Sequence, residues 1–167
     1  MARRFRHHGQ SEATRYEYFD IGYNYRMTDI TAAIGRVQLG KLPELTDKRI
    51  SNAKFLSGRI SRIPGLKIPK VKKEAKHVFH QYTIRVTEDF PVSRDELKKI
   101  LSDNGIGSSV FYPKPLHLSP WLSGLGWKEG DFPVSELLSR EVLCLPVQPF
   151  LSESELEKIA AVLGGIK

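Results

Sequence analysis

The sequence predicts an α+β domain in which a small, mainly antiparallel sheet has helices on one face. Three observations support this prediction. The chain has 167 residues, enough for one domain with a hydrophobic core. Its 40% hydrophobic and 27% charged residues are typical of a globular chain rather than a disordered or fibrous one. Helical and strand periods follow one another as helix, helix, strand, strand, helix, strand, helix and helix.

The first part of the chain divides into an arm and two helices. Residues 1–20 show no sustained period, which indicates an extended arm. Thr28 can cap a helix, and the apolar positions that follow at helical spacing are Ile30, Ala33, Ile34 and Val37. Gly40 and Pro43 interrupt this pattern. We therefore expect a break there and a second helix from Pro43 to about Arg62.

Three segments are predicted to be strands. A short strand covers Leu66–Ile68, after the helix stop at Ile63–Gly65. The longest alternation of side chains predicts a strand over His77–Val86. Ser108–Tyr112 is a third strand, and Val142–Leu145 is a short apolar segment that Pro146 ends.

Three later helices carry recognisable start or stop signals. Ser93 with Glu96 three residues later predicts a capping box, and the helix ends at Asn104. Residues 134–141 form the next helix. Ser152 opens the last amphipathic helix, which two glycines close.

Composition narrows the class of protein. No apolar run approaches the roughly 20 residues of a membrane span. The basic N-terminus has no apolar stretch behind it, so it does not resemble a secretory signal. Cys144 is the single cysteine, which excludes an internal disulfide and a cysteine-rich zinc site. We expect a reducing, cytoplasmic setting and no membrane partner.

The basic excess is concentrated in the middle of the chain. Residues 51–100 carry 12 basic and 5 acidic side chains, a net charge of +7. Such a run suits an anionic partner, although it is more often a solvated face. Nucleic acid is an unlikely partner, because no recognition helix or RNA-binding motif accompanies the lysines at 67, 70, 72, 73 and 76.

Metal and nucleophilic chemistry find little support. His77 and His80 would point to opposite faces of a strand and could not share one ion. Cys144 lies between leucines and is predicted to be a small buried hydrophobe. We expect no metal site and no catalytic residue in this chain.

The most informative stretch is residues 20–39. Asn24 offers two amide donors, Arg26 offers a planar fork for phosphate or carboxylate, and a helix N-terminus follows. The alternative is that Asn24 caps a turn while Arg26 pairs with Asp20 or Asp29. The residues alone do not decide between these readings.

The same stretch closely resembles the DegT/DnrJ/EryC1/StrS family of sugar aminotransferases that depend on pyridoxal phosphate (PLP). The family phrase is roughly G-x-N-Y-R-M-T/S-D/E-I/L-x-A-A-x-G-x-x-Q-L, and residues 22–39 meet nearly every fixed position. Further matches follow in order at Arg6 with His8–Gly9, Leu42–Leu45 with Lys48–Arg49, His80–Val86, Tyr112–Pro120, Gly130–Glu136 and Leu143–Pro149.

The resemblance implies a division of the protein. Family members look about twice as long, and their first part is a large α/β domain that holds the cofactor and its Schiff-base lysine. We therefore expect this chain to be the C-terminal small domain of a fold-type-I PLP aminotransferase. Residues 1–27 would be an N-terminal arm and interface turn, residues 28–167 the small domain, and the large PLP domain absent.

The resemblance also implies roles for four residues. Asn24 would reach the phosphate of PLP bound by the other subunit, so PLP is the expected cofactor but not a covalent ligand of this chain. Arg26 would lie near the anionic groups of the substrate, and Tyr112 and His117 would line the nucleotide-sugar pocket. Phe111 stands where the family usually has histidine, so any hydrogen bond made there is lost.

The implied function is transfer of an amino group from glutamate to a nucleotide-linked keto-sugar. We expect the chain alone to be inactive, and we expect a homo-oligomer, a dimer in the first instance. A separately encoded large PLP domain is the other expected partner. The alternative is a non-enzymatic regulatory or nucleic-acid-binding protein built on the same domain.

Overall fold

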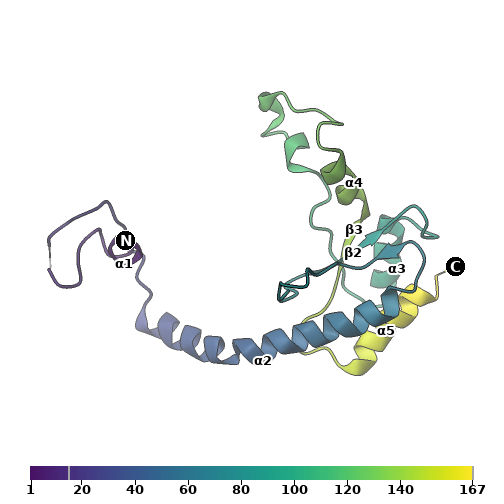
Figure 1. Cartoon of the computed structure of the whole chain (residues 1–167), viewed down its shortest axis with the longest axis horizontal. Helices are drawn as coiled ribbons and strands as arrows, with labels where there is room; N and C mark the ends of the chain where they lie inside the picture. The colour runs from purple at the N-terminus through teal and green to yellow at the C-terminus, as the bar shows by residue number, and fades with distance from the viewer. Residues whose placement is uncertain (15, 167) are drawn as a thin grey trace. The chain divides into compact units, whose positions relative to one another are not determined.

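The computed structural model describes residues 1–14 and 16–166 (Figure 1). They form two compact units that divide between Pro43 and Glu44. The first unit holds α1 (Ala2–Phe5) and the start of α2 (Asp29–Ile60). The second unit holds the remainder of α2 together with β1 (Leu66–Lys67), β2 (Tyr82–Val86), α3 (Arg94–Asp103), η1 (Leu116–Leu118), η2 (Ser123–Leu125), α4 (Pro133–Glu141), β3 (Val142–Leu145) and α5 (Glu153–Gly164). The predicted division into an arm and interface turn (residues 1–27) and a small domain (residues 28–167) is a different kind of boundary, and it stays a prediction.

Helix α2 corrects the predicted break at Gly40 and Pro43. Pro43 lies inside one helix of 32 residues, so the two expected helices are one. Proline cannot donate to the Leu39 carbonyl, and an unpaired carbonyl is costly only where water cannot reach it. Leu39 and Pro43 are both exposed, so solvent can satisfy that carbonyl and the helix continues.

The sheet has three strands in the order β1-β2-β3, and both pairs are antiparallel. β2 is central. It places Tyr82, Ile84 and Val86 on one face, where all three are buried. In register with β2, Leu143 lies opposite Ile84 and Leu145 opposite Tyr82, so the same face of β3 is also apolar.

This apolar face carries the core of the second unit. The helices that cover it are α2, α3 and α5, as expected for helices on one face of a small sheet (Figure 1). Their buried core residues are Ala53, Leu56, Ile60, Leu97, Leu101, Leu156, Ile159 and Leu163. Among the described residues, α4 contributes none to this core.

The other face of the sheet is mixed, with Thr83 and Arg85 of β2 opposite the buried Cys144 and Val142 of β3. Thr83 Oγ1 lies 2.9 Å from Cys144 Sγ, and Arg85 Nε donates to Glu141 at 2.6 Å. Cys144 is buried, as predicted, but it lies on this face and outside the main core.

The predicted strand over His77–Val86 is half as long as expected, and the one predicted over Ser108–Tyr112 does not form. His77–Gln81 do not join β2, because Phe79 has a φ of 47° and its N–H donates to His77 Nδ1, which closes a turn. Ser108–Tyr112 forms a single bridge, Ser109 to Cys144, instead of a strand. The following prolines at 113 and 115 lack the N–H needed to extend a ladder.

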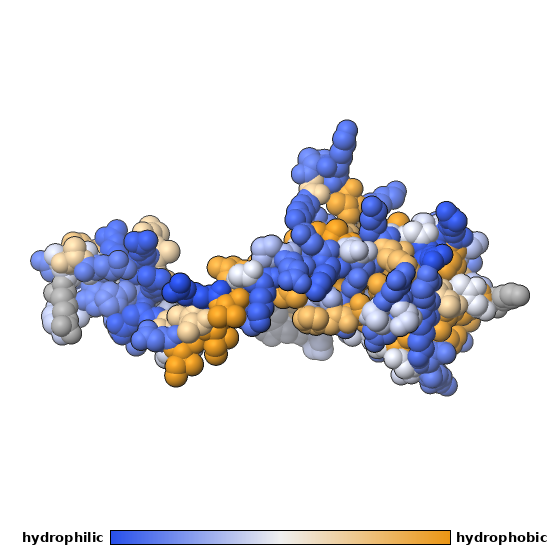
Figure 2. All heavy atoms as spheres, turned by 90° about the horizontal axis from the view of Figure 1, so that it is seen from below, coloured by the Kyte–Doolittle hydropathy of each residue, from blue (hydrophilic) through white to orange (hydrophobic). Residues whose placement is uncertain are grey.

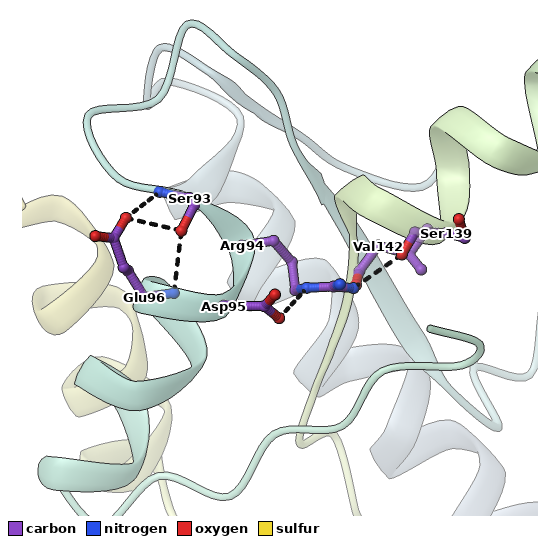
Figure 3. Close-up of polar contacts among 6 residues, drawn as sticks. All are labelled: Ser93, Arg94, Asp95, Glu96, Ser139 and Val142. Carbon is purple, nitrogen blue, oxygen red and sulfur yellow. Dashed lines mark hydrogen bonds and ion pairs between the residues drawn. The ribbon is translucent and has the colours of Figure 1, made fainter. Parts of the chain in front are cut away.

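Helix α3 is fixed at its start by two devices (Figure 3). The predicted capping box is present, with Ser93 and Glu96 bonding to each other's backbone N–H. Arg94, which is buried, donates from Nη1 to the carbonyls of Ser139 and Val142, each at 3.1 Å. The guanidinium thus satisfies carbonyls at the end of α4 and joins α3 to β3. Ser152, predicted to open the last helix, does so at α5, where it forms a capping box with Glu155.

The first unit has no comparable core. All buried apolar residues of the described chain lie in the second unit. The first half of α2 presents apolar side chains to solvent (Figure 2). They are Ile30, Ile34, Val37, Leu39 and Leu42, each at least half exposed.

Candidate functional site

The first unit is organised by two chain segments that pair in antiparallel fashion. The His8 N–H donates to the Tyr23 carbonyl, and the Tyr25 N–H donates to the Arg6 carbonyl, each at 3.0 Å. Two glycines permit this approach. A Cβ on Gly22 would lie 2.1 Å from the Gly9 nitrogen, and Gly9 has a φ of 78°. Any larger residue at either position would separate the segments.

This pairing brings Asn24, Arg26 and His7 together. His7 and Asn24 are bridge partners, and side chains directly opposite each other share a face. Arg26 follows Asn24 by two residues, the spacing that returns an extended chain to the same face. Arg26 Nε donates to Asn24 Oδ1 at 2.9 Å, and Arg26 Nη1 lies 3.2 Å from His7 Nδ1.

The chemistry of this cluster fixes the direction of the Asn24 amide. A guanidinium only donates hydrogen bonds, so the atom of Asn24 that faces Arg26 must be the oxygen. The amide NH₂ therefore points away, and it has no partner among residues 1–14 and 16–166. The alternative in which Arg26 pairs with Asp20 or Asp29 is wrong, since Asp20 pairs with Arg4 at 3.2 Å and Arg26 bonds to Asn24 and His7.

A hollow of about 480 Å³ lies beside the cluster, and two guanidinium groups, those of Arg6 and Arg26, are part of its mainly apolar lining. Its residues are Arg6, His7, Glu12, Tyr25, Arg26, Met27 and Ala32. Glu12 supplies the one carboxylate, and it lies 3.5 Å from the Arg6 guanidinium. Helix α2 begins next to it, with Thr28 Oγ1 accepting from the Thr31 N–H as the predicted cap. Exposed donors and cations in a hollow of this size suit a phosphate-bearing ligand.

The two predicted residues of the long loop lie in the second unit. Tyr112 is 70% exposed at the start of the loop. His117 is buried, and its Nε2 lies 3.0 Å from Glu136 Oε1. The Glu136 carboxylate also accepts from the N–H groups of Gly130 and Phe132. Burial raises the pKa of Glu136, but these hydrogen bonds and the contact with His117 outweigh it, so the pKa lies below 4.5.

Sequence reasoning missed the partners of these residues. Nothing local marked His7, because its contact with Asn24 and Arg26 depends on the register between two segments. Glu136 was matched only as part of the motif at residues 130–136, and its contacts with His117 and the Gly130 N–H were not predicted. A second hollow, of about 290 Å³, lies where Phe111, Arg49 and His80 meet the end of β3.

The described residues offer no site for an imine-forming lysine or a metal ion. Every lysine among them is exposed, so none occupies the dry pocket that lowers the pKa of an imine-forming lysine. In the same residues no group of three or more His, Cys, Asp and Glu side chains could hold a metal ion. No helix of the described chain is long and apolar enough to cross a bilayer.

Comparison with known proteins identifies the family. The sequence profile of the DegT/DnrJ/EryC1/StrS aminotransferase family matches residues 1–164. The chain belongs to this family. The resemblance carried by residues 22–39 is thereby confirmed. Two solved structures of a putative sugar aminotransferase from Streptococcus pneumoniae, in the PMP-form and the PLP-form, each match with a TM-score of 0.81 and 26% identity, covering 97% of this chain and 41% of that one.

Individual family members match the chain over part of their own length. It is 38% identical over 152 residues to a pleiotropic regulatory protein from Geobacillus stearothermophilus, covering 87% of this chain and 40% of that protein. It is 32% identical over 158 residues to the dTDP-3-amino-3,4,6-trideoxy-alpha-D-glucose transaminase of Streptomyces venezuelae, covering 94% and 40%. The structure of DesV from S. venezuelae matches with a TM-score of 0.84 and 29% identity, covering 97% of this chain and 42% of DesV.

These matches confirm the predicted fold class, and they cover only part of each relative. The chain spans about 40% of the length of the family members it matches, and the matched part is their C-terminal part. The fold is that of the small domain of a PLP aminotransferase, as expected from the sequence.

Proposed function

We propose that this chain is the C-terminal small domain of a PLP-dependent aminotransferase that acts on nucleotide-linked keto-sugars. The observation that carries the proposal is the Asn24 amide, whose oxygen is held by Arg26 and whose NH₂ has no partner among the described residues, next to a hollow that Arg6 and Arg26 help to line. This is the donor that a phosphate group needs. The active site would be completed by a large domain and by a second subunit.

The described residues fit the phosphate end of PLP and not its aldehyde end. Asn24 would donate to a phosphate oxygen, and the Arg26 charge beside it would favour the anion. Bound PLP supplies the electron sink that transfer of an amino group requires. The lysine that holds the aldehyde would come from the large domain, because the described lysines of this chain are all exposed.

The substrate class is supported by the names of relatives and by the exposed side chain of Tyr112. Relatives are named as a transaminase of a dTDP-linked sugar, a GDP-perosamine synthase and an aminotransferase of a UDP-linked sugar. We propose glutamate as the donor and Arg26 as a residue near the anionic groups of the substrate. Tyr112 and His117 would line the nucleotide-sugar pocket, with His117 anchoring its loop to Glu136.

The proposed partners follow from the exposed apolar residues of the first unit. Ile30, Ile34 and Val37 are each more than half exposed, which is costly in water for a helix face. A second copy of the chain and a large PLP domain would cover such a surface. A cytoplasmic site of action suits both a nucleotide-sugar substrate and the free thiol of Cys144.

Reconstitution tests this proposal. The chain is co-expressed with the N-terminal large domain of a family member, and retained PLP is measured by absorbance after gel filtration. We expect PLP retention with the wild-type chain and a clear reduction with Asn24→Ala. Arg36→Met, a charge change at an exposed site on α2, is the matched control. Retention that is indifferent to Asn24 would count against the proposal.

A second candidate function is binding to nucleic acid in a regulatory role. The observation that favours it is the run of exposed lysines at 67, 70, 72, 73 and 76. Of these five lysines only Lys76 forms an ion pair with a described residue, Asp47, at 3.5 Å. A relative is also named as a pleiotropic regulatory protein. Binding of random duplex DNA at low and high salt decides the matter, since phosphate contacts weaken steeply with salt. Absence of salt-sensitive binding removes this candidate.

A further inference from the structure

Asparagine has an ambiguity that matters for phosphate binding. Its side-chain amide has an oxygen that accepts and an NH₂ that donates, and a half-turn about the last torsion exchanges them. A phosphate needs the NH₂, whereas the oxygen would repel it. An exposed asparagine such as Asn24 samples both directions unless a neighbour selects one.

Arg26 is placed to make this selection. Its Nε–H donates to Asn24 Oδ1 at 2.9 Å, which only the productive direction of the amide permits. The reversed amide would place two donors against each other and lose the bond.

The guanidinium is itself held on its other side. Arg26 Nη1 lies 3.2 Å from His7 Nδ1, which must accept because the guanidinium cannot. The ring proton of His7 is then on Nε2, so the nearby Gln10 amide nitrogen cannot donate to it, and the ring is held in place by the backbone pairing of His7 with Asn24.

From this geometry we propose that Arg26 is a positioning residue that orients the Asn24 amide toward the cofactor phosphate, with His7 holding the guanidinium. The inference rests on the proposed function and deepens it. Nη2 of Arg26 has no partner among the described residues, so the same side chain can still face the anionic groups of a substrate.

The orientation itself is measured in the 167-residue chain. The ¹⁵N relaxation of the Asn24 side-chain NH₂ reports whether the amide is ordered. We expect an ordered amide in the wild type and in Arg36→Met, and a mobile one in Arg26→Met. Backbone signals of His8 and Tyr25 show whether the paired segments remain intact. An Asn24 amide that stays ordered in Arg26→Met overturns the proposal.

The consequence for the phosphate is measured in the complex with a large domain. The probe is pyridoxamine 5′-phosphate, and pyridoxamine serves as the phosphate-free control. We expect Asn24→Ala to weaken binding of the phosphate form by about tenfold. We expect Arg26→Met to weaken it several-fold, and the double variant to be no weaker than Asn24→Ala.

The outcomes separate the two proposals. Effects that multiply in the double variant mean that Arg26 contacts the phosphate independently, and they overturn the positioning role. No change in Asn24→Ala overturns the proposed function of Asn24, while amide order in the chain alone still decides whether Arg26 orients it.

Discussion

The two units of the chain solve different problems. The second unit buries the large apolar side chains, with Tyr82, Leu101 and Leu143 fully inaccessible to solvent. In the first unit the buried residues among those described are Gly9 and Gln10, while Ile21 and Met27 are largely exposed. The second unit therefore has the core that holds a fold by itself. The first unit is held by backbone pairing and polar contacts, and its apolar side chains on α2 are exposed.

Truncation of apolar side chains should give the largest difference in stability between the two units. Leu143→Ala removes a fully buried side chain from the face of β3 that packs on the helices. We expect a loss of about 3 kcal/mol in the free energy of unfolding, measured by urea denaturation of the chain. Ile34→Ala, at a site 60% exposed, should change it by less than about 0.5 kcal/mol. Similar losses in both variants would show that the first unit has a core of its own.

The buried guanidinium of Arg94 should produce the next largest effect. Arg94→Met keeps much of the side-chain volume but leaves the carbonyls of Ser139 and Val142 without their donor. We expect a cost of about 2 kcal/mol in urea denaturation, because both carbonyls lie at a buried junction. Arg36→Met removes an exposed cation and should cost almost nothing. Equal stability of the two variants would mean that water replaces the Arg94 donor.

A glycine substitution tests whether the backbone pairing of the first unit can be lost while the second unit stays folded. Gly22→Ala places a Cβ 2.1 Å from the Gly9 nitrogen, so the paired segments must separate. We expect loss of hydrogen-exchange protection at His8 and Tyr25, which report this pairing, by about tenfold or more. The urea transition of the second unit should not move. Gly35→Ala, which has open space around its Cβ, is the matched control. Loss of protection in the core strands would show that the two units fold as one.

The sequence predicted features that depend on neighbouring residues, but not those that depend on pairing between distant segments. The capping boxes at Ser93 and Ser152 need only residues three apart, so sequence alone placed the starts of α3 and α5. The turn that removes His77–Gln81 from β2 depends on a left-handed Phe79, for which the alternating pattern gave no sign. Pro43 inside α2 was unexpected because the exposure of its neighbourhood is a property of the fold.

The same distinction applies to the candidate site. Asn24 and Arg26 were found because they share one short motif, and their spacing of two residues places them on one face. Their mutual hydrogen bond and the support from His7 depend on how residues 5–10 meet residues 18–25. That register is set by the contact of Gly9 with Gly22, two residues that carry no functional group. The motif predicted which residues matter, and the pairing explains how they act together.

Acid should loosen one loop of the second unit before its core. The pKa of Glu136 lies below the ordinary carboxyl value of 4.5 in the folded chain, so its contribution is present above that value and is lost as pH falls through the folded-state pKa. Protonation weakens acceptance from the N–H groups of Gly130 and Phe132, and both should lose exchange protection below about pH 4.5. The pKa values of Glu96 and Glu155 in the capping boxes are lowered as well, so overall stability declines over the same range. Glu136→Gln separates the effects, since its loop should exchange quickly at every pH while the caps still titrate. If the loop amides of Glu136→Gln keep wild-type protection at neutral pH, the carboxylate does not hold the loop, and the His117 contact with it has no structural role.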